Sequence, residues 1–251
     1  MRKRVLAAVS LVALSVFCAA QSPLDDLRKK AEAALSSQNG TGLGEEKITA
    51  GLKEALRVST GKAVAQTGRT DGFLKNAAIR IALPPRLQTA GKGMRLVGMG
   101  AQVDELEVGM NRAAELAAPK AKEIFLNSLL KMTIRDAHGI LTGGDTAATD
   151  YFKRTSTQEL TVAFTPIVHQ AMERVGVVRQ YNQVVQTSMA SRFAGTRNFD
   201  LDAYVVGKTL DGLFYVLGQE EARIRKDPAA QTTALLKEVF GKARIANANP
   251  D

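Results

Sequence analysis

Apolar positions recur every three or four residues through most of the chain, the spacing that places them on one face of an α-helix. Four stripes of this kind stand out, and their members in order are Ile48, Leu52, Ala55, Leu56, Ser59 and Ala63; Val103, Leu106, Met110, Ala113 and Ala117; Ala121, Ile124, Phe125, Leu129 and Met132; and Val206, Leu210, Leu213, Phe214, Leu217 and Ile224. No segment sustains the strict apolar–polar alternation of a half-buried strand. The pattern predicts an all-α fold, a single bundle of about eight to ten helices.

Proline, glycine and capping residues mark the breaks between these helices. Gly68 and Pro119 close the first two stripes, and the segment 83–86 contains two prolines, which lack the amide donor that a helix interior needs. Thr133 and Asp136 have the spacing of a capping box. Further helix starts are predicted at Thr155 or Ser156, at Asp200 and at Asp227-Pro228.

The chain begins with the basic segment 2–4, an apolar run from Val5 to Phe17, and then Cys18-Ala19-Ala20-Gln21. A basic start, a short apolar segment and a small-residue cleavage site are typical of a secretory signal peptide. The run is shorter than the roughly 20 residues that span a bilayer. We therefore expect residues 1–20 to be removed by cleavage after about Ala20, which places the mature protein in the periplasm.

Cys18 leaves an alternative, a lipoprotein that is acylated at this cysteine. Phe17 disfavours it, because lipoprotein cleavage sites have a small residue at this position. Cleavage after Ala20 would instead remove the only cysteine of the chain. The mature protein would then form no disulfide, use no cysteine nucleophile and hold no zinc through sulfur.

The rest of the chain divides into three parts by composition. Residues 21–44 are predicted to form a short helix and a flexible linker, because segment 36–44 is rich in Ser and Gly. Residues 45–241 form the all-helical domain, and residues 242–251 a polar, disordered tail. With about 230 residues after cleavage, the mature chain can bury a sizeable core.

The charge of the chain is moderately positive and is spread along its length. Loss of the three basic residues of the signal peptide reduces the 34 Lys and Arg to 31, against 25 Asp and Glu, a net charge of +6. This excess favours weak attraction to anionic membrane surfaces or acidic partners. Because the basic residues do not cluster and the chain has no Trp, we expect no binding to nucleic acid.

The segment Thr142, Gly143, Gly144 and Asp145 is the best candidate for a ligand site. The two glycines end one helix, and Asp145 is expected to cap the next one. Backbone amides at a glycine pair and a helix start can hold an anion such as phosphate. Against this, the Asp145 carboxylate would occupy the same amides, so a tight turn between two helices is the simpler interpretation.

The sequence identifies no catalytic residue, no metal ligands and no cofactor. The two histidines, His138 and His169, lack the His-x-x-x-His or Glu-x-x-His spacing of metal sites. Three charged groups are expected to pair locally on solvated helix faces. They are Glu105, Glu107, Asn111, Arg112 and Glu115; Lys208 and Asp211; and the run 220–226.

Several stretches in this order resemble one family: Met110-Asn111-Arg112-Ala113-Ala114-Glu115, Ala137-His138-Gly139-Ile140-Leu141-Thr142-Gly143-Gly144-Asp145, Lys208-Thr209-Leu210-Asp211-Gly212-Leu213-Phe214 and Asp227-Pro228-Ala229-Ala230. They are similar to the exported bacterial proteins grouped as domain of unknown function 4197, roughly from Glu45 to Gly241. The resemblance implies a mostly helical, periplasmic protein of Gram-negative-type bacteria. It carries no activity and no catalytic residue, and His138 stands where the family leads us to expect Lys or another polar residue.

Our leading hypothesis is a non-enzymatic periplasmic protein that binds an apolar or amphiphilic ligand such as a lipid, or a partner in the envelope. Adaptable side chains for such a ligand are Met94, Met99, Met110 and Met132, for which core filling is the alternative. A hydrolase with its site near Thr142–Asp145 and His138 is a second hypothesis, and a purely structural envelope protein is a third. We expect no transmembrane anchor, and the oligomeric state stays open.

Overall fold

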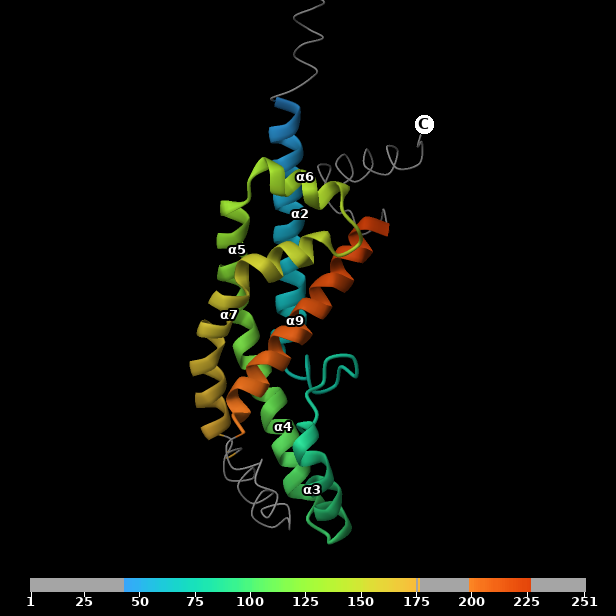
Figure 1. The fold of residues 1–251 in the computed structure, drawn as a ribbon, viewed down its shortest axis with the longest axis vertical. Helices are drawn as coiled ribbons and strands as arrows, with labels where there is room; N and C mark the ends of the chain where they lie inside the picture. Colours follow the sequence, from blue (N-terminus) through green and yellow to red (C-terminus); the bar gives the residue numbers. More distant parts are fainter. Residues whose placement is uncertain (1–42, 175, 177–198, 227–251) are drawn as a thin grey trace, which may run out of the picture. The chain divides into compact units, whose positions relative to one another are not determined.

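In the computed structural model, the described residues are 43–174, 176 and 199–226. They form helices and no strand, which confirms the predicted all-α fold. In chain order the elements are α2 (Leu43–Gly68), α3 (Pro85–Leu96), α4 (Gly100–Ala117), the 3₁₀ turn η1 (Ala118–Lys120), α5 (Ala121–Lys131), α6 (Ile134–Thr142), α7 (Ala147–Arg174) and α9 (Leu201–Lys226) (Figure 1). The predicted signal peptide, the Asp227-Pro228 helix start and the predicted tail lie outside the described residues.

The chain divides into two compact units, residues 1–46 and 47–251. Nearly all described residues belong to the second unit, and the fold described below is that of the second unit. Within its described part, no helix combines the length and the apolar character needed to cross a membrane.

Several helix boundaries lie where the sequence predicts them. Helix α2 ends at Gly68, and α3 begins at Pro85 in the first helical turn, where proline is tolerated. The capping box is present before α6, since the Asp136 amide donates to Thr133 Oγ1 and the Thr133 amide donates to Asp136 Oδ2, both at 3.1 Å. Asp200 caps α9 by accepting from the Ala203 amide at 2.8 Å.

The predicted helix start at Thr155 or Ser156 is wrong, because α7 runs without interruption from Ala147 to Arg174. Both hydroxyls find partners inside the helical structure. Thr155 Oγ1 donates to the Tyr151 carbonyl at 2.9 Å, and Ser156 Oγ lies 2.9 Å from Ser128 Oγ of α5. The two hydroxyls thus serve the interior of α7 and its contact with α5, and they cap no helix.

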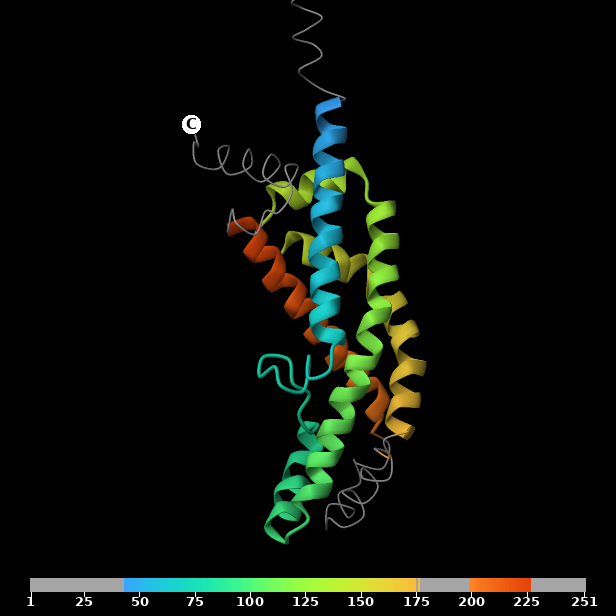
Figure 2. The same cartoon turned by 180° about the vertical axis from the view of Figure 1, so that it is seen from behind.

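The apolar stripes meet in one core. Helix α9 packs on α7 and α4, and α5 and α6 also pack on α7 (Figure 2). Phe125 of α5 lies between Phe152 of α7 and Phe214 of α9, with ring centroids 5.0 and 6.1 Å apart. These rings bury large apolar areas, so they contribute strongly to the stability of the bundle.

The segment 69–84 joins α2 to α3 and packs against α9 at Gly212. Phe73 of this segment is fully buried, and a Cβ atom at position 212 would lie 2.5 Å from Phe73 Cε1 and 3.1 Å from Ile79 Cβ. Only a residue without a side chain fits there. The Asp-Gly-Leu-Phe stretch in α9 thus has a packing role.

We expect Gly212→Ala to lower the free energy of unfolding by about 1–3 kcal/mol, because the added methyl group would overpack the core. A matched control lies on the same helix. At Gly207 an added Cβ meets no atom within 4 Å, so Gly207→Ala is expected to stabilise the protein by about 0.5–1 kcal/mol through helix propensity. Urea unfolding of both variants checks the prediction, and changes of the same sign would contradict it.

Candidate functional site

The turn that the sequence singles out connects α6 to α7. Thr142 ends α6, and the side chains of Thr142 and Asp145 are exposed. Gly143 is required by packing, because a Cβ atom there would lie 2.6 Å from Ala147 Cβ and 2.7 Å from the Gly139 carbonyl oxygen. Helix α6 ends at Thr142 and α7 begins at Ala147, which confirms the helix stop and restart predicted at this turn.

The first amides of α7 are occupied by a carboxylate from a distant part of the chain. Glu221 of α9 accepts hydrogen bonds from the amides of Ala148 and Thr149, each at 2.8 Å, and from Thr149 Oγ1 at 2.8 Å. Its side chain is 4% exposed. A carboxylate at a helix start is favoured by the orphan amides and the helix dipole. Glu221 therefore fills the place that an anionic ligand would take.

Arg225 completes this buried network. Its Nε and Nη2 atoms donate to Glu221 Oε1 at 3.0 and 2.8 Å, and Nη2 also donates to the Ile140 carbonyl at 2.7 Å. The pair thus joins the start of α7, the last turn of α6 and α9. The expectation that the run 220–226 is a solvated helix end is wrong for Glu221 and Arg225, while Glu220 and Arg223 do form a local pair.

Asp145 does not make the cap that the sequence predicts for it. Its carboxylate forms an ion pair with Lys226 at the end of α9, and both side chains are more than half exposed. Ligand binding at Thr142–Asp145 stays a prediction. Two of the first amides of α7, those of Ala148 and Thr149, already donate to Glu221.

The polar residues of α4 form a row that holds the segment 69–84. Glu115 Oε1 accepts from the amides of Phe73 and Leu74, both at 3.1 Å, and Glu107 Oε1 accepts from the Leu83 amide at 3.4 Å. Glu115 is 4% exposed. The solvated face predicted for this cluster is therefore wrong for Glu107 and Glu115, while Glu105 is exposed as predicted. Glu115 fixes a long connection.

Asn111 is the central member of this row and is completely buried. Its Oδ1 accepts from the Ile81 amide at 2.9 Å, and its Nδ2 donates to the Ile81 carbonyl at 2.8 Å and to the Glu107 carbonyl at 2.7 Å. The Asn111 side chain thus pairs with both the amide and the carbonyl of Ile81, as a neighbouring strand does in a β-sheet. The predicted Arg112–Glu115 pair is confirmed, and Arg112 also binds Asp71 at 2.7 Å.

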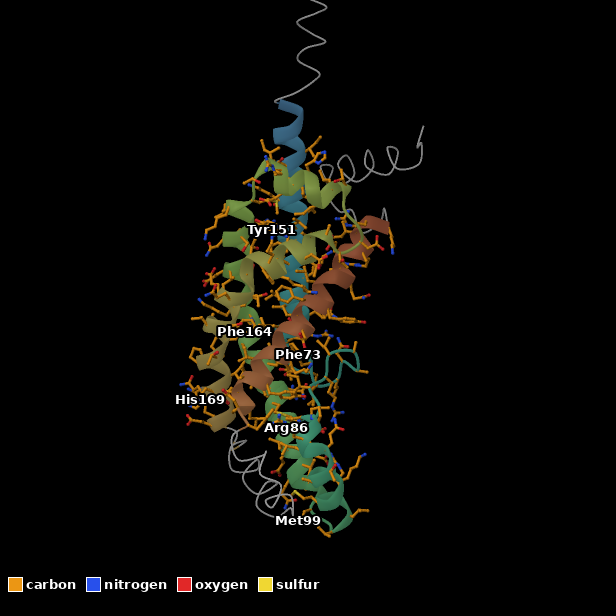
Figure 3. The ribbon with its side chains drawn as sticks, in the orientation of Figure 1. Phe73, Arg86, Met99, Tyr151, Phe164 and His169 are labelled. Atoms are coloured by element: carbon orange, nitrogen blue, oxygen red, sulfur yellow. The ribbon has the colours of Figure 1, made fainter. Side chains whose placement is uncertain are left out.

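Both histidines are exposed on the surface. His169 lies on α7, far from the turn between α6 and α7 (Figure 3). His169 Nδ1 lies 2.6 Å from Asp202 Oδ2, and this hydrogen bond raises the pKa of His169. Glu173 lies on its other side, 3.5 Å from Nε2. Across the described part of the chain, no three His, Cys, Asp or Glu side chains come together as metal ligands would.

The methionines considered as ligand lining fill the core instead. Met94, Met110 and Met132 are 2%, 0% and 4% exposed, while Met99 is partly buried against the core. Beside Glu221, a void of about 10 Å³ has room for roughly one water molecule. A shallow surface groove of about 200 Å³ lies between α3 and α4, lined by Ala82, Leu83, Gln88, Gly91, Lys92, Arg95 and Glu107.

Helices α3 and α4 form an antiparallel hairpin, and its connecting turn carries exposed apolar side chains. We call residues Leu96–Met99 the hairpin tip; Met99 is labelled in Figure 3. The side chains of Leu96 and Val97 are 88% and 71% exposed. Gly98 reverses the chain at φ +85°, a conformation that favours glycine. Turns between helices normally carry polar residues, so two adjacent apolar side chains with this exposure are unusual there.

The sequence gives no prediction for Leu96 and Val97, because neither residue belongs to one of the four apolar stripes. The only sequence signal is that both residues precede a glycine after the last polar positions of α3. Other exposed apolar side chains occur on α5 and α7, among them Leu130 and Val162, each 71% exposed. Val162 stands between hydroxyl-bearing positions, so it is a single exposed side chain, which is common on protein surfaces.

The fold and these surfaces define an all-helical protein with buried polar networks that fix its connections. The chain belongs to the family described as a protein of unknown function, DUF4197, which it matches over residues 42–241. This confirms the family resemblance noted in the sequence. Neither the curated proteins nor the solved structures contain a significant match.

Proposed function

We propose that this protein is a non-enzymatic binding protein of the bacterial periplasm, which docks on a component of the cell envelope through the hairpin tip. The observation that carries the proposal is the exposure of Leu96 and Val97, 88% and 71%, at the turn of a well-packed helical hairpin. Export through the predicted signal peptide, residues 1–20, would bring the mature chain to the envelope.

The hairpin supports docking because its base is firmly packed. Leu87 and Met94 of α3 are buried, and Val103 of α4 is completely buried. Arg95 pairs with Asp104 across the two helices at 2.5 Å. A rigid support holds the apolar tip in one place, so docking costs little conformational entropy.

The other functions considered for the chain have weaker support. An apolar ligand held among the methionines would need space where Met94, Met110 and Met132 are packed. A hydrolase at the α6–α7 turn would need groups that assist the reaction, and there Glu221 is committed to Arg225 and to the amides of α7.

Fractionation of cells that express the full chain tests the proposal. We expect the protein to sediment with the envelope and the double variant Leu96→Ser, Val97→Ser to move largely to the soluble periplasmic fraction. The matched control replaces Leu130 and Val162, whose exposure is similar, with Ser and should leave the distribution unchanged. Retention of the tip variant in the envelope, or release of the control variant instead, would overturn the proposal.

A further inference from the structure

The hairpin tip combines its apolar side chains with cations. From Pro85 to Val103 the chain contains Arg86, Lys92 and Arg95 and no Asp or Glu. Arg95 lies in the last turn of α3, and Lys92 lies one turn before Leu96 on the same side of the helix. Both cationic side chains are exposed at the surface.

The acidic groups facing this part of α3 come from α4. Glu107 lines the same surface groove as Lys92 and Arg95, and its carboxylate pairs with Arg80 at 2.9 Å. Asp104 pairs with Arg95 at 2.5 Å, and Arg95 keeps 40% of its side chain exposed. Glu105 follows on the same helix, one turn further from the tip than Gln102. The positive charge next to Leu96 and Val97 is therefore that of Lys92, with Arg95 partly neutralised.

We infer that the envelope component bound by the tip is an anionic lipid surface, a step that rests on the proposed function. Leu96 and Val97 would enter the region between headgroups and acyl chains, as apolar residues of peripheral proteins do. Lys92 has a long apolar stem, so its ammonium group can stay at the headgroup level and contact lipid phosphates while Leu96 is immersed. An apolar tip beside a cation fits an anionic lipid surface better than an uncharged lipid surface.

The absence of tryptophan from the chain allows a direct test. Val97→Trp introduces a single fluorescent reporter at the tip of the full chain. We expect its emission to shift to shorter wavelength on addition of vesicles of phosphatidylcholine mixed with phosphatidylglycerol. The matched control is Val162→Trp, which starts from the same 71% exposure on α7 and should show no shift.

Sedimentation with the same vesicles measures how much Leu96 and Lys92 each contribute to vesicle binding. Leu96→Ser should weaken binding about tenfold or more, because the apolar side chain no longer leaves water. Lys92→Ala should weaken it about fivefold, and added salt should reduce this difference. Lys122→Ala, an exposed lysine on α5, should have no effect.

Three results would overturn the inference: no shift at position 97, equal shifts at positions 97 and 162, or equal binding to vesicles of pure phosphatidylcholine. The fractionation experiment then separates the two levels. If vesicles are not bound but the tip variant still leaves the envelope fraction, the tip docks on an envelope protein, and the proposed function stands without the lipid inference. If the tip variant stays in the envelope fraction, the proposed function itself fails.

Discussion

Replacing Glu221 with alanine is expected to lower the free energy of unfolding by about 3–5 kcal/mol. The change leaves Arg225, whose side chain is 12% exposed, as a buried cation without its carboxylate partner. It also leaves the amides of Ala148 and Thr149 without the acceptor that they have at 2.8 Å. Both losses act together because a single side chain serves both groups. Urea unfolding of the mature chain, followed by circular dichroism, measures the effect.

The neighbouring residue provides the control. Glu220 is 15% exposed, but its partner within one turn of the same helix is Arg223, which is 47% exposed and can return to water when the pair is broken. Glu220→Ala should therefore cost much less, about 1 kcal/mol. Adding Arg225→Met to Glu221→Ala should recover part of the loss, because it removes a positive charge that has lost its carboxylate partner at position 221. Equal stabilities of the Glu220 and Glu221 variants would show that the buried network does not hold the three helices together.

The helices themselves could be predicted from the sequence because their signals are local. A stripe with a period near 3.6 residues shows which face is buried, as in α4, where Val103 and Met110 are completely buried. The starts of α6 and α9 were found because Thr133 and Asp200 bind amides only three residues away. Such contacts do not depend on the rest of the fold.

The buried polar groups could not be predicted because their partners are distant along the chain. Glu221 lies 72 residues from Thr149, and Asn111 lies 30 residues from Ile81. In the sequence both look like members of solvated charged clusters. One signal was present: Glu221 falls four residues after Leu217 and three before Ile224, on the apolar stripe of α9. A charge on that face needs a buried partner.

Only part of the candidate site could be predicted, because some of its contacts come from distant parts of the chain. The turn at Thr142–Asp145 is predicted by its two adjacent glycines, and α6 ends at Thr142. Whether its amides are open to a ligand depends on α9, which local patterns do not reveal. The hairpin tip escaped prediction because exposure of Leu96 depends on where the turn after α3 projects, not on the residue type.

Asn111→Leu is expected to cost about 2–4 kcal/mol of stability, because it leaves both the amide and the carbonyl of Ile81 buried without a partner. Leucine has a similar size, so the loss reports the hydrogen bonds more than a cavity. The control is Asn127→Leu on α5, where the side chain is exposed and a change within about 0.5 kcal/mol is expected. Urea unfolding measures both variants.

A second substitution separates lost hydrogen bonds from altered packing. Asn111→Asp keeps the shape and can still accept from the Ile81 amide, but an ionised carboxylate cannot donate to the carbonyls of Ile81 and Glu107. Burial raises the pKa of such a carboxyl group above its unfolded value, so its penalty is present at neutral pH and shrinks as the pH falls. Amide exchange at Ile81 should be faster in both variants than in the Asn127 control. If Asn111→Leu were as stable as the parent, or if exchange at Ile81 were unchanged, the hydrogen bonds between Asn111 and Ile81 would not hold the connection 69–84 in place.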